Sequence, residues 1–186
     1  MSRCRIINGK YKRRYITAPL VKTTRPTSDL VKQAIFNVLI HRFRFDFQSA
    51  FVIDLFAGSG SLGIEAISCG CDNVLFVDSN IKAIECIKKN TRELNIEDKS
   101  KIILNFSEKI PSYVFKKLSD SYDTVLAFLD PPYSEKELLK SQISKLTELF
   151  KAQSLIIVAE SDEGIPNSAC IVRHGNTLAS ILHNPQ

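Results

Sequence analysis

From about residue 50 onward, short apolar runs alternate with amphipathic stretches along the chain. The apolar runs predict strands at 50–57, 73–78, 101–106, 123–130 and 154–160. Between them, apolar residues recur at helical spacing and predict helices at 58–69, 79–94, 108–118 and 135–150. Two last segments, 169–174 and 177–184, are joined through a Gly-Asn pair and predict a closing antiparallel pair. The pattern predicts an α/β, Rossmann-like fold: a mostly parallel seven-stranded sheet with helices on both faces.

The first 48 residues follow a different pattern. Asn8 and Gly9 stand between two strand-like segments, and Asn-Gly is a strong hairpin signal because both residues tolerate positive φ. A helix is expected after Pro26, capped by Thr27 or Ser28. Its core-facing stripe is predicted at Leu30, Val31, Ala34, Ile35, Val38 and Leu39. We therefore divide the chain into an N-terminal hairpin and helix (1–48) and an α/β core (49–186), within one compact unit.

The composition is that of an ordinary globular domain, with 186 residues, 44% of them hydrophobic and 24% charged. The longest apolar runs have five residues, far fewer than the roughly 20 of a membrane span, and the N-terminus lacks a secretory signal pattern. The five cysteines form no C-x-x-C pair, and the three histidines lack metal-ligand spacing. We expect a cytoplasmic monomer with reduced thiols that binds no membrane and no metal.

Positive charge is concentrated near the N-terminus. Residues 1–48 contain eleven lysines and arginines against Asp29 and Asp46, a net charge of +9, whereas residues 49–186 carry −4. A basic arm on a mildly acidic body indicates a polyanionic partner, most often nucleic acid. The alternative is a basic surface that is merely solvated.

The stretch DLFAGSGSLGIEA (54–66) joins the end of the first core strand to a glycine-rich turn and a helix start. Gly58, Gly60 and Gly63 fit G-x-G-x-x-G, which lets the backbone turn sharply and approach a ligand at a helix N-terminus. A dinucleotide and S-adenosylmethionine both bind such loops, and Asp78, at the end of the next strand, suits the ribose of either. Asp54 favours S-adenosylmethionine, because a carboxylate there would repel a pyrophosphate and attract an ammonium group.

A second polar motif, DPPY, follows the apolar strand at 123–130. A nucleobase amino group is a poor nucleophile, because its lone pair is delocalised into the ring. Asp130 and the carbonyl of Pro131 are two acceptors that could hold its hydrogens and turn the lone pair toward a methyl group. The prolines restrict the backbone and fix that carbonyl, and Tyr133 offers a ring face on which the base stacks. The motif predicts methyl transfer to an amino nitrogen by positioning and electrostatics, without a metal.

The order of these motifs resembles that of class I S-adenosylmethionine-dependent methyltransferases acting on amino nitrogens. The stretches RIINGKYKRRYI, RPTSDLVKQAIFNVL and RHGNTLASIL narrow the resemblance to the RsmD type, which methylates guanine N2 in bacterial 16S ribosomal RNA. The resemblance covers nearly the whole chain. It implies 16S ribosomal RNA or the small ribosomal subunit as the partner.

The resemblance also implies roles for individual residues. The predicted cofactor-binding set is Asp54, Phe56, Gly58, Gly60, Gly63, Asp78, Ser79, Asn105 and Phe106. The predicted catalytic set is Asp130, Pro131 and Tyr133, and the predicted RNA-binding set is Arg3, Arg5, Lys10, Lys12, Arg13, Arg14 and Arg25. One position departs from the family pattern, which usually has an acidic residue by the adenine after the third strand. Here Asn105 or Ser107 is the candidate for a hydrogen bond, and Phe106 for packing on the adenine.

Two other functions fit some of these features. DNA adenine-N6 methyltransferases also carry DPPY, but only residues 61–129 lie between the glycine loop and Asp130, which leaves no room for a target-recognition domain. An inert nucleic-acid-binding module that keeps the fold is the second alternative. The intact acids Asp54, Asp78 and Asp130 argue against it.

Overall fold

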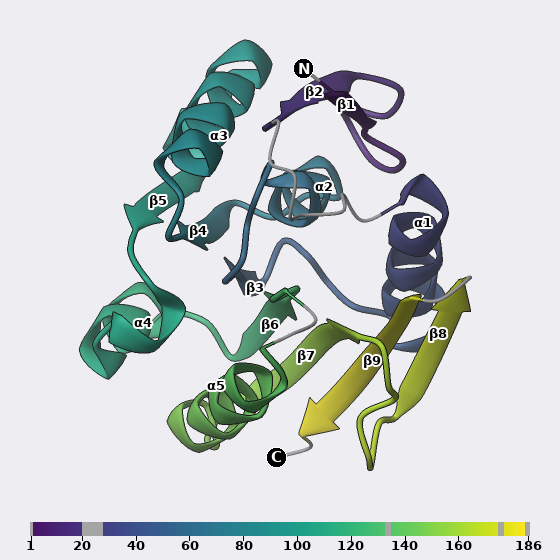
Figure 1. Cartoon of the computed structure of the whole chain (residues 1–186), viewed down its shortest axis with the longest axis vertical. Helices are drawn as coiled ribbons and strands as arrows, with labels where there is room; N and C mark the ends of the chain where they lie inside the picture. Colours follow the sequence, from purple (N-terminus) through teal and green to yellow (C-terminus); the bar gives the residue numbers. More distant parts are fainter. Residues whose placement is uncertain (1, 20–27, 133–134, 175–176, 185–186) are drawn as a thin grey trace.

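The computed structural model describes residues 2–19, 28–132, 135–174 and 177–184. Its centre is a seven-stranded sheet in the order β5-β4-β3-β6-β7-β9-β8 (Figure 1). The strands are β3 (Ala50–Asp54), β4 (Asn73–Asp78), β5 (Ser100–Leu104), β6 (Thr124–Leu129), β7 (Ser154–Ser161), β8 (Cys170–His174) and β9 (Thr177–Asn184). The pairs from β5 to β7 are parallel, and β9 is antiparallel to both β7 and β8. The predicted sheet and its closing pair are confirmed.

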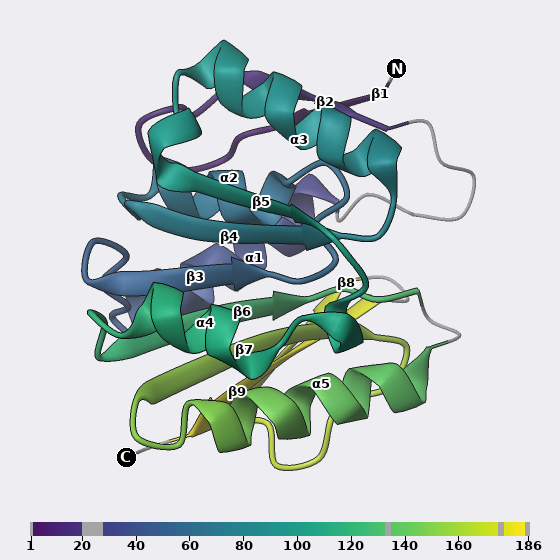
Figure 2. The same cartoon turned by 90° about the vertical axis from the view of Figure 1, so that its left-hand side faces the viewer.

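Helices cover both faces of this sheet. The α-helices of the described chain are α1 (Asp29–Asn37), α2 (Ser61–Ser68), α3 (Ile81–Leu94), α4 (Ser112–Ser119) and α5 (Lys136–Leu149). Shorter turns are the π-helical η1 (Val38–Arg42) and the 3-10 turns η2 (Glu97–Lys99) and η3 (Ser107–Lys109). Helices α1, α2 and α3 share one hydrophobic core with the sheet, and α4 and α5 share the other, in front of the strands in Figure 2. The sheet therefore lies between two cores, as strands with apolar residues on both faces require.

Helix α1 begins as the sequence predicts, and Val31, Ile35 and Leu39 of the predicted stripe are buried. Ser28 is its N-cap, and the serine hydroxyl accepts a hydrogen bond from Val31 N (3.2 Å). The prediction for Leu30 is wrong, because this side chain is 57% exposed. The buried face also includes Lys32 and Phe36. Polar contacts of Lys32, described below, satisfy its buried ammonium group.

The N-terminal arm is the expected antiparallel hairpin of β1 (Ser2–Arg5) and β2 (Tyr15–Ala18). The Asn8-Gly9 pair lies within a longer loop, because residues 6–14 connect the strands and Lys12 N donates to Gly9 O (3.2 Å). The end of α2 explains the longer loop, since Glu65 and Ser68 accept hydrogen bonds from its N–H groups. A Cβ on Gly9 would lie 1.8 Å from the Ser68 carbonyl oxygen, so the close approach needs glycine.

Candidate active site

Four carboxylates line the edge of the sheet at which the parallel strands end. Asp78, Asp54 and Glu160 lie on β4, β3 and β7, and Asp130 directly follows β6, the strand between β3 and β7. The residues two positions earlier on these strands all belong to the core on the α1–α3 face: Phe76, Val52, Val158 and Phe128. Because side chains alternate between faces, the three carboxylates that lie within strands are directed to that same face, and Asp130 is near enough to Asp54 for its charge to raise the pKa of Asp54. Ligands of α/β proteins bind at this edge.

Asp54 is the most buried of the three predicted site acids. The residue is only 3% exposed, and Asp54 Oδ2 accepts a hydrogen bond from Gly63 N (3.0 Å). Burial raises the pKa of Asp54 to about 7; the Gly63 N–H opposes the rise, and the negative charges of Asp130 and Asp78 add to it. Gly63 packs so closely that a Cβ there would lie 2.3 Å from Phe76 Cε1. A cation placed beside Asp54 would ionise this carboxyl group.

The glycine turn and Asp78 form a second part of the site. Asp78 Oδ2 accepts a hydrogen bond from Gly58 N (2.8 Å), and Oδ1 accepts one from Asn80 N (2.8 Å). Gly60, at the N-cap of α2, has φ +77°, a left-handed conformation that glycine adopts without strain. These contacts hold both carboxylate oxygens of Asp78 in place beside the start of α2, and each oxygen keeps acceptor capacity for a ligand hydroxyl.

The segment after β5 continues the site beyond Asp78. Asn105 N donates to the Asp78 carbonyl (3.0 Å), while Asn105 Oδ1 accepts from Phe106 N (2.9 Å). The ring of Phe106 is 51% exposed, and Lys109 Nζ lies 4.6 Å from its centroid. Ser107, by contrast, is buried. Of the three candidates for the adenine contact, Asn105 and Phe106 are thus the accessible ones.

The remaining predicted residues lie close to the same edge. Asp130 is half-buried and Pro131 is buried, whereas Tyr133 lies outside the described residues. Phe56 is half-buried against the core on the α4–α5 face, and Ser79 is exposed directly after β4. A hollow beside Asp130 is lined by both prolines of the motif together with residues of α5 and the end of β7.

The structure separates the predicted RNA-binding residues into two groups. Arg3 and Arg5 lie on β1, and Arg5 Nε contacts Asp29 Oδ2 (3.3 Å) in the first turn of α1. The loop residues Lys10, Lys12, Arg13 and Arg14 lie at the other end of α2, where Lys10 N donates to the carbonyl of the last residue of that helix (2.7 Å). Eight helical residues separate this loop from the glycine turn, about 12 Å along the axis. Arg25 lies outside the described residues.

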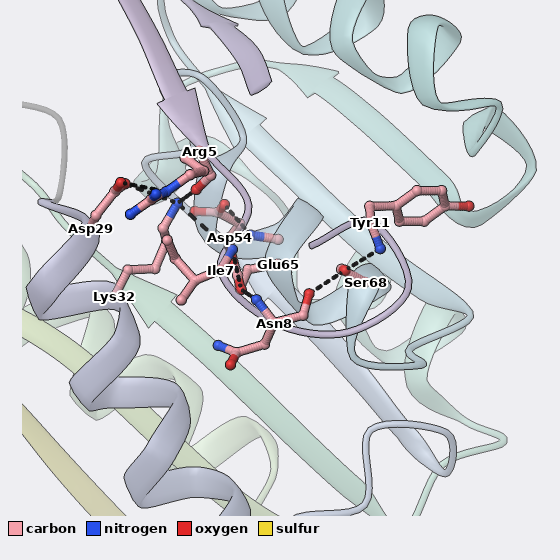
Figure 3. A network of polar contacts seen from close by, with 10 residues as sticks. Arg5, Ile7, Asn8, Tyr11, Asp29, Lys32, Asp54, Glu65 and Ser68 are labelled. Carbon is pink, nitrogen blue, oxygen red and sulfur yellow. Dashed lines mark hydrogen bonds and ion pairs between the residues drawn. The ribbon is translucent and has the colours of Figure 1, made fainter. Parts of the chain in front are cut away.

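Sequence reasoning gave no role to a buried ion pair that fastens the arm (Figure 3). Lys32 and Glu65 are both 0% exposed, with Lys32 Nζ 3.7 Å from Glu65 Oε2. Lys32 Nζ also donates to Arg5 O (2.6 Å), and Glu65 accepts from Ile7 N (3.0 Å) and Asn8 N (2.5 Å). Burial raises the pKa of Glu65, and the Ile7 N–H and Lys32 oppose that rise. The signal in the sequence was a lysine on the apolar face of α1.

A second missed residue joins the arm to the glycine turn. Asn90 Nδ2, on α3, donates to Ser59 O (2.9 Å) and to Thr17 O (2.8 Å), while Asn90 Oδ1 accepts from Thr17 N (2.9 Å). One buried amide therefore ties β2 to the glycine turn. Asn90 on α3 thus fastens β2, while Glu65 and Ser68 on α2 fasten the loop between β1 and β2.

Two further searches cover the described ranges of the chain. None of the helices there combines the length and apolarity needed to cross a membrane. Across the same residues, no three His, Cys, Asp or Glu side chains are grouped as metal ligands.

The chain is similar to several known proteins. A family model described as "Conserved hypothetical protein 95" matches residues 4–177. "Putative rRNA methyltransferase YlbH" of Bacillus subtilis is 36% identical over 162 residues, covering 87% of this chain and 84% of the relative. "Ribosomal RNA small subunit methyltransferase D" of Haemophilus influenzae is 35% identical over 159 residues, covering 83% and 77%. The solved structure of "Putative methyltransferase yhhF from Escherichia coli" shares the fold, with a TM-score of 0.75 at 23% identity and 98% coverage of both chains.

Proposed function

The chain belongs to the family described as Conserved hypothetical protein 95, the RsmD type of ribosomal RNA methyltransferase, and from this premise we propose its reaction. It transfers a methyl group from S-adenosylmethionine to the exocyclic N2 of a guanine in 16S ribosomal RNA. The observation that carries the proposal is the row of Asp78, Asp54 and Asp130 at the ends of neighbouring strands beside the glycine turn.

The residues at this edge fit S-adenosylmethionine better than a dinucleotide. Asp54 is buried with a pKa of about 7, so an amino-acid ammonium group beside it gains a charged partner in a site of low dielectric constant. Asp78 has its oxygens held for ribose hydroxyls. A pyrophosphate would instead face a row of carboxylates. When bound, S-adenosylmethionine supplies a methyl group activated on a sulfonium sulfur.

Asp130 and Pro131 act on the nucleobase. Their carboxylate and carbonyl accept the two N2 hydrogens of guanine, which orients the nitrogen lone pair. The carboxylate also stabilises the positive charge that develops on the nitrogen during transfer. The target base has to leave its stack in the RNA to reach this edge of the sheet.

The two groups of basic residues indicate a large RNA partner. Arg3 and Arg5 place charge near the catalytic edge, and the loop at 10–14 places charge at the far end of α2. An RNA that contacts both has to extend along the arm, which suits a folded RNA or an assembled particle. We propose that the enzyme acts as a monomer on the small ribosomal subunit in the cytoplasm.

The proposal is tested by transfer of a labelled methyl group to four acceptors. These are small ribosomal subunits from cells lacking the native enzyme, naked 16S RNA, large subunits and duplex DNA. We expect label in small-subunit RNA that is recovered as N2-methylguanosine, at one mapped nucleotide. Label in DNA as N6-methyladenine would refute the substrate while leaving the chemistry intact. Failure to bind S-adenosylmethionine in a calorimetric titration would favour the inert module.

A further inference from the structure

Glu160 lies beside the catalytic Asp130 without a role in the reaction as described so far. Leu129 of β6 pairs with Ala159 of β7 in parallel register, so the next residues of the two segments, Asp130 and Glu160, follow at the same level. Neighbouring strands lie about 4.8 Å apart, so the two residues are close together at the strand ends. Glu160 is only 4% exposed, unusual for a glutamate.

A small hollow lies next to Asp130 at the ends of β6 and β7. Its lining combines the apolar Pro131, Pro132 and Leu139 with the polar Glu135, Lys136, Glu160, Ser161 and Asp162. Glu160 therefore borders the same hollow as the two prolines that follow Asp130. The hollow adjoins the carbonyl and carboxylate that hold the reacting amine, so a base held there by its amino group has its ring edge toward β7.

The neighbouring ring atom distinguishes the two purines that offer an exocyclic amine. Beside N2, guanine presents N1–H, which donates a hydrogen bond. Beside N6, adenine presents N1 as an acceptor with a lone pair. A carboxylate at this position accepts from guanine and repels adenine.

We propose that Glu160 is a specificity-determining residue that accepts the N1–H of the target guanine. The inference rests on the proposed function and deepens it, because DPPY alone does not separate a guanine from an adenine enzyme. Three acceptors then match the three donor hydrogens along one edge of the base: Asp130 and the Pro131 carbonyl for the two on N2, and Glu160 for the one on N1.

The test uses 2-aminopurine, which keeps the N2 amine of guanine but has no hydrogen on N1. Small subunits are reconstituted with ligated 16S RNA that carries guanine or 2-aminopurine at the mapped nucleotide. For the wild-type enzyme we expect kcat/KM to be roughly 10- to 100-fold higher with guanine. In Glu160→Gln, whose amide both donates and accepts, we expect this preference to shrink by about tenfold or more.

Two further variants separate recognition from folding. Glu163→Gln makes the same chemical change at a side chain that is 80% exposed, and it should keep the full preference. Glu160→Asp retains a carboxylate and should still prefer guanine even if its rate falls. Equal wild-type rates on the two bases, or an equal loss on both in Glu160→Gln, would overturn the role of Glu160 while the proposed function stands. No wild-type transfer to guanine would overturn the proposed function and this inference with it.

Discussion

Replacing Lys32 by methionine tests whether the buried ion pair holds the arm on the core. Methionine keeps most of the length and apolar contact of the lysine but removes its charge and its donors. In the native protein the Lys32 ammonium lies 3.7 Å from Glu65 Oε2, donates to Arg5 O at 2.6 Å and lies 4.0 Å from Asp29 Oδ1. The variant leaves a carboxylate at 0% exposure without its cation.

The expected loss is a large part of the stability of one domain. Removing one partner of a buried pair costs about 3–5 kcal/mol. We expect a value near 3 kcal/mol, because Glu65 still accepts hydrogen bonds from Ile7 N and Asn8 N. The free energy of unfolding of a typical domain is about 5–15 kcal/mol. The variant should therefore still fold, but it should unfold at a much lower urea concentration than the wild type.

The loss should also depend on pH in a definite direction. Burial already raises the pKa of Glu65 above its ordinary value of 4.5, and Lys32 opposes that rise, so Lys32→Met raises the pKa further. The folded variant then binds a proton over a range in which the unfolded chain is ionised, and stability falls as pH rises through that range. The deficit relative to wild type should be smaller at pH 5 than at pH 8.

Urea unfolding at these two pH values measures the effect, and trypsin cleavage in the basic loop at 10–14 reports whether the arm has detached. Lys89→Met is the matched control, because its ion pair with Glu93 is about half exposed on both sides, and it should change stability by less than about 0.5 kcal/mol. Adding Glu65→Gln to Lys32→Met should recover part of the loss, because no buried charge remains. A loss below about 1 kcal/mol, or one that is the same at both pH values, would refute the role of the pair.

Four further outcomes follow from the site and the arm. The pKa of Asp54 is about 7, against an ordinary value of 3.8. The cofactor-free protein should therefore lose on the order of 4 kcal/mol of unfolding free energy as pH rises from about 4 to 7. In urea unfolding, Asp54→Asn should not show this dependence of the unfolding free energy on pH. Gly63→Ala, whose Cβ would lie 2.3 Å from a ring carbon, should lower the unfolding free energy by about 1–3 kcal/mol, and an unchanged midpoint would contradict the packing. Asp130→Ala should abolish methyl transfer while calorimetry still detects cofactor binding, and retained transfer would remove Asp130 from the mechanism. Neutral replacements of Arg13 and Arg14 should weaken RNA binding and flatten its log–log salt dependence by roughly one unit per lost phosphate contact; an unchanged slope would place RNA elsewhere.

The sequence predicts the order of strands and helices well, because their patterns are local. Apolar runs such as Val125–Leu129 are buried on both faces of a parallel sheet, and they identify its central strands without knowledge of their partners. The positions of Asp54 and Asp130 follow from the same reasoning, since each acid stands where an apolar run ends. Polar residues that directly follow apolar runs therefore indicate which residues line the candidate site.

Features that depend on distant partners were not predictable from one sequence. Lys32 is buried because Glu65, 33 positions later in the sequence, and the carbonyl of Arg5 meet it, and helical spacing alone assigned the core face to Leu30. The Asn8-Gly9 signal favoured a short turn, but hydrogen bonds to α2 extend the loop. The neighbour of Asp130 is likewise fixed by the order of the sheet, which places β7 beside β6.

The row of carboxylates would be unfavourable if every member were ionised in the absence of ligand. Burial raises the pKa of Asp54 to about 7, and the charges of Asp130 and Asp78 add to the rise, so a proton on Asp54 limits the repulsion below that pH. A cationic ligand replaces that proton with a charge that the other acids also attract. In the proposed reaction, the acids that would repel a dinucleotide favour a positively charged cofactor, and the same negative charges stabilise an amine that becomes positive during methylation. We therefore propose that cofactor choice and catalysis depend on one electrostatic arrangement at the strand ends.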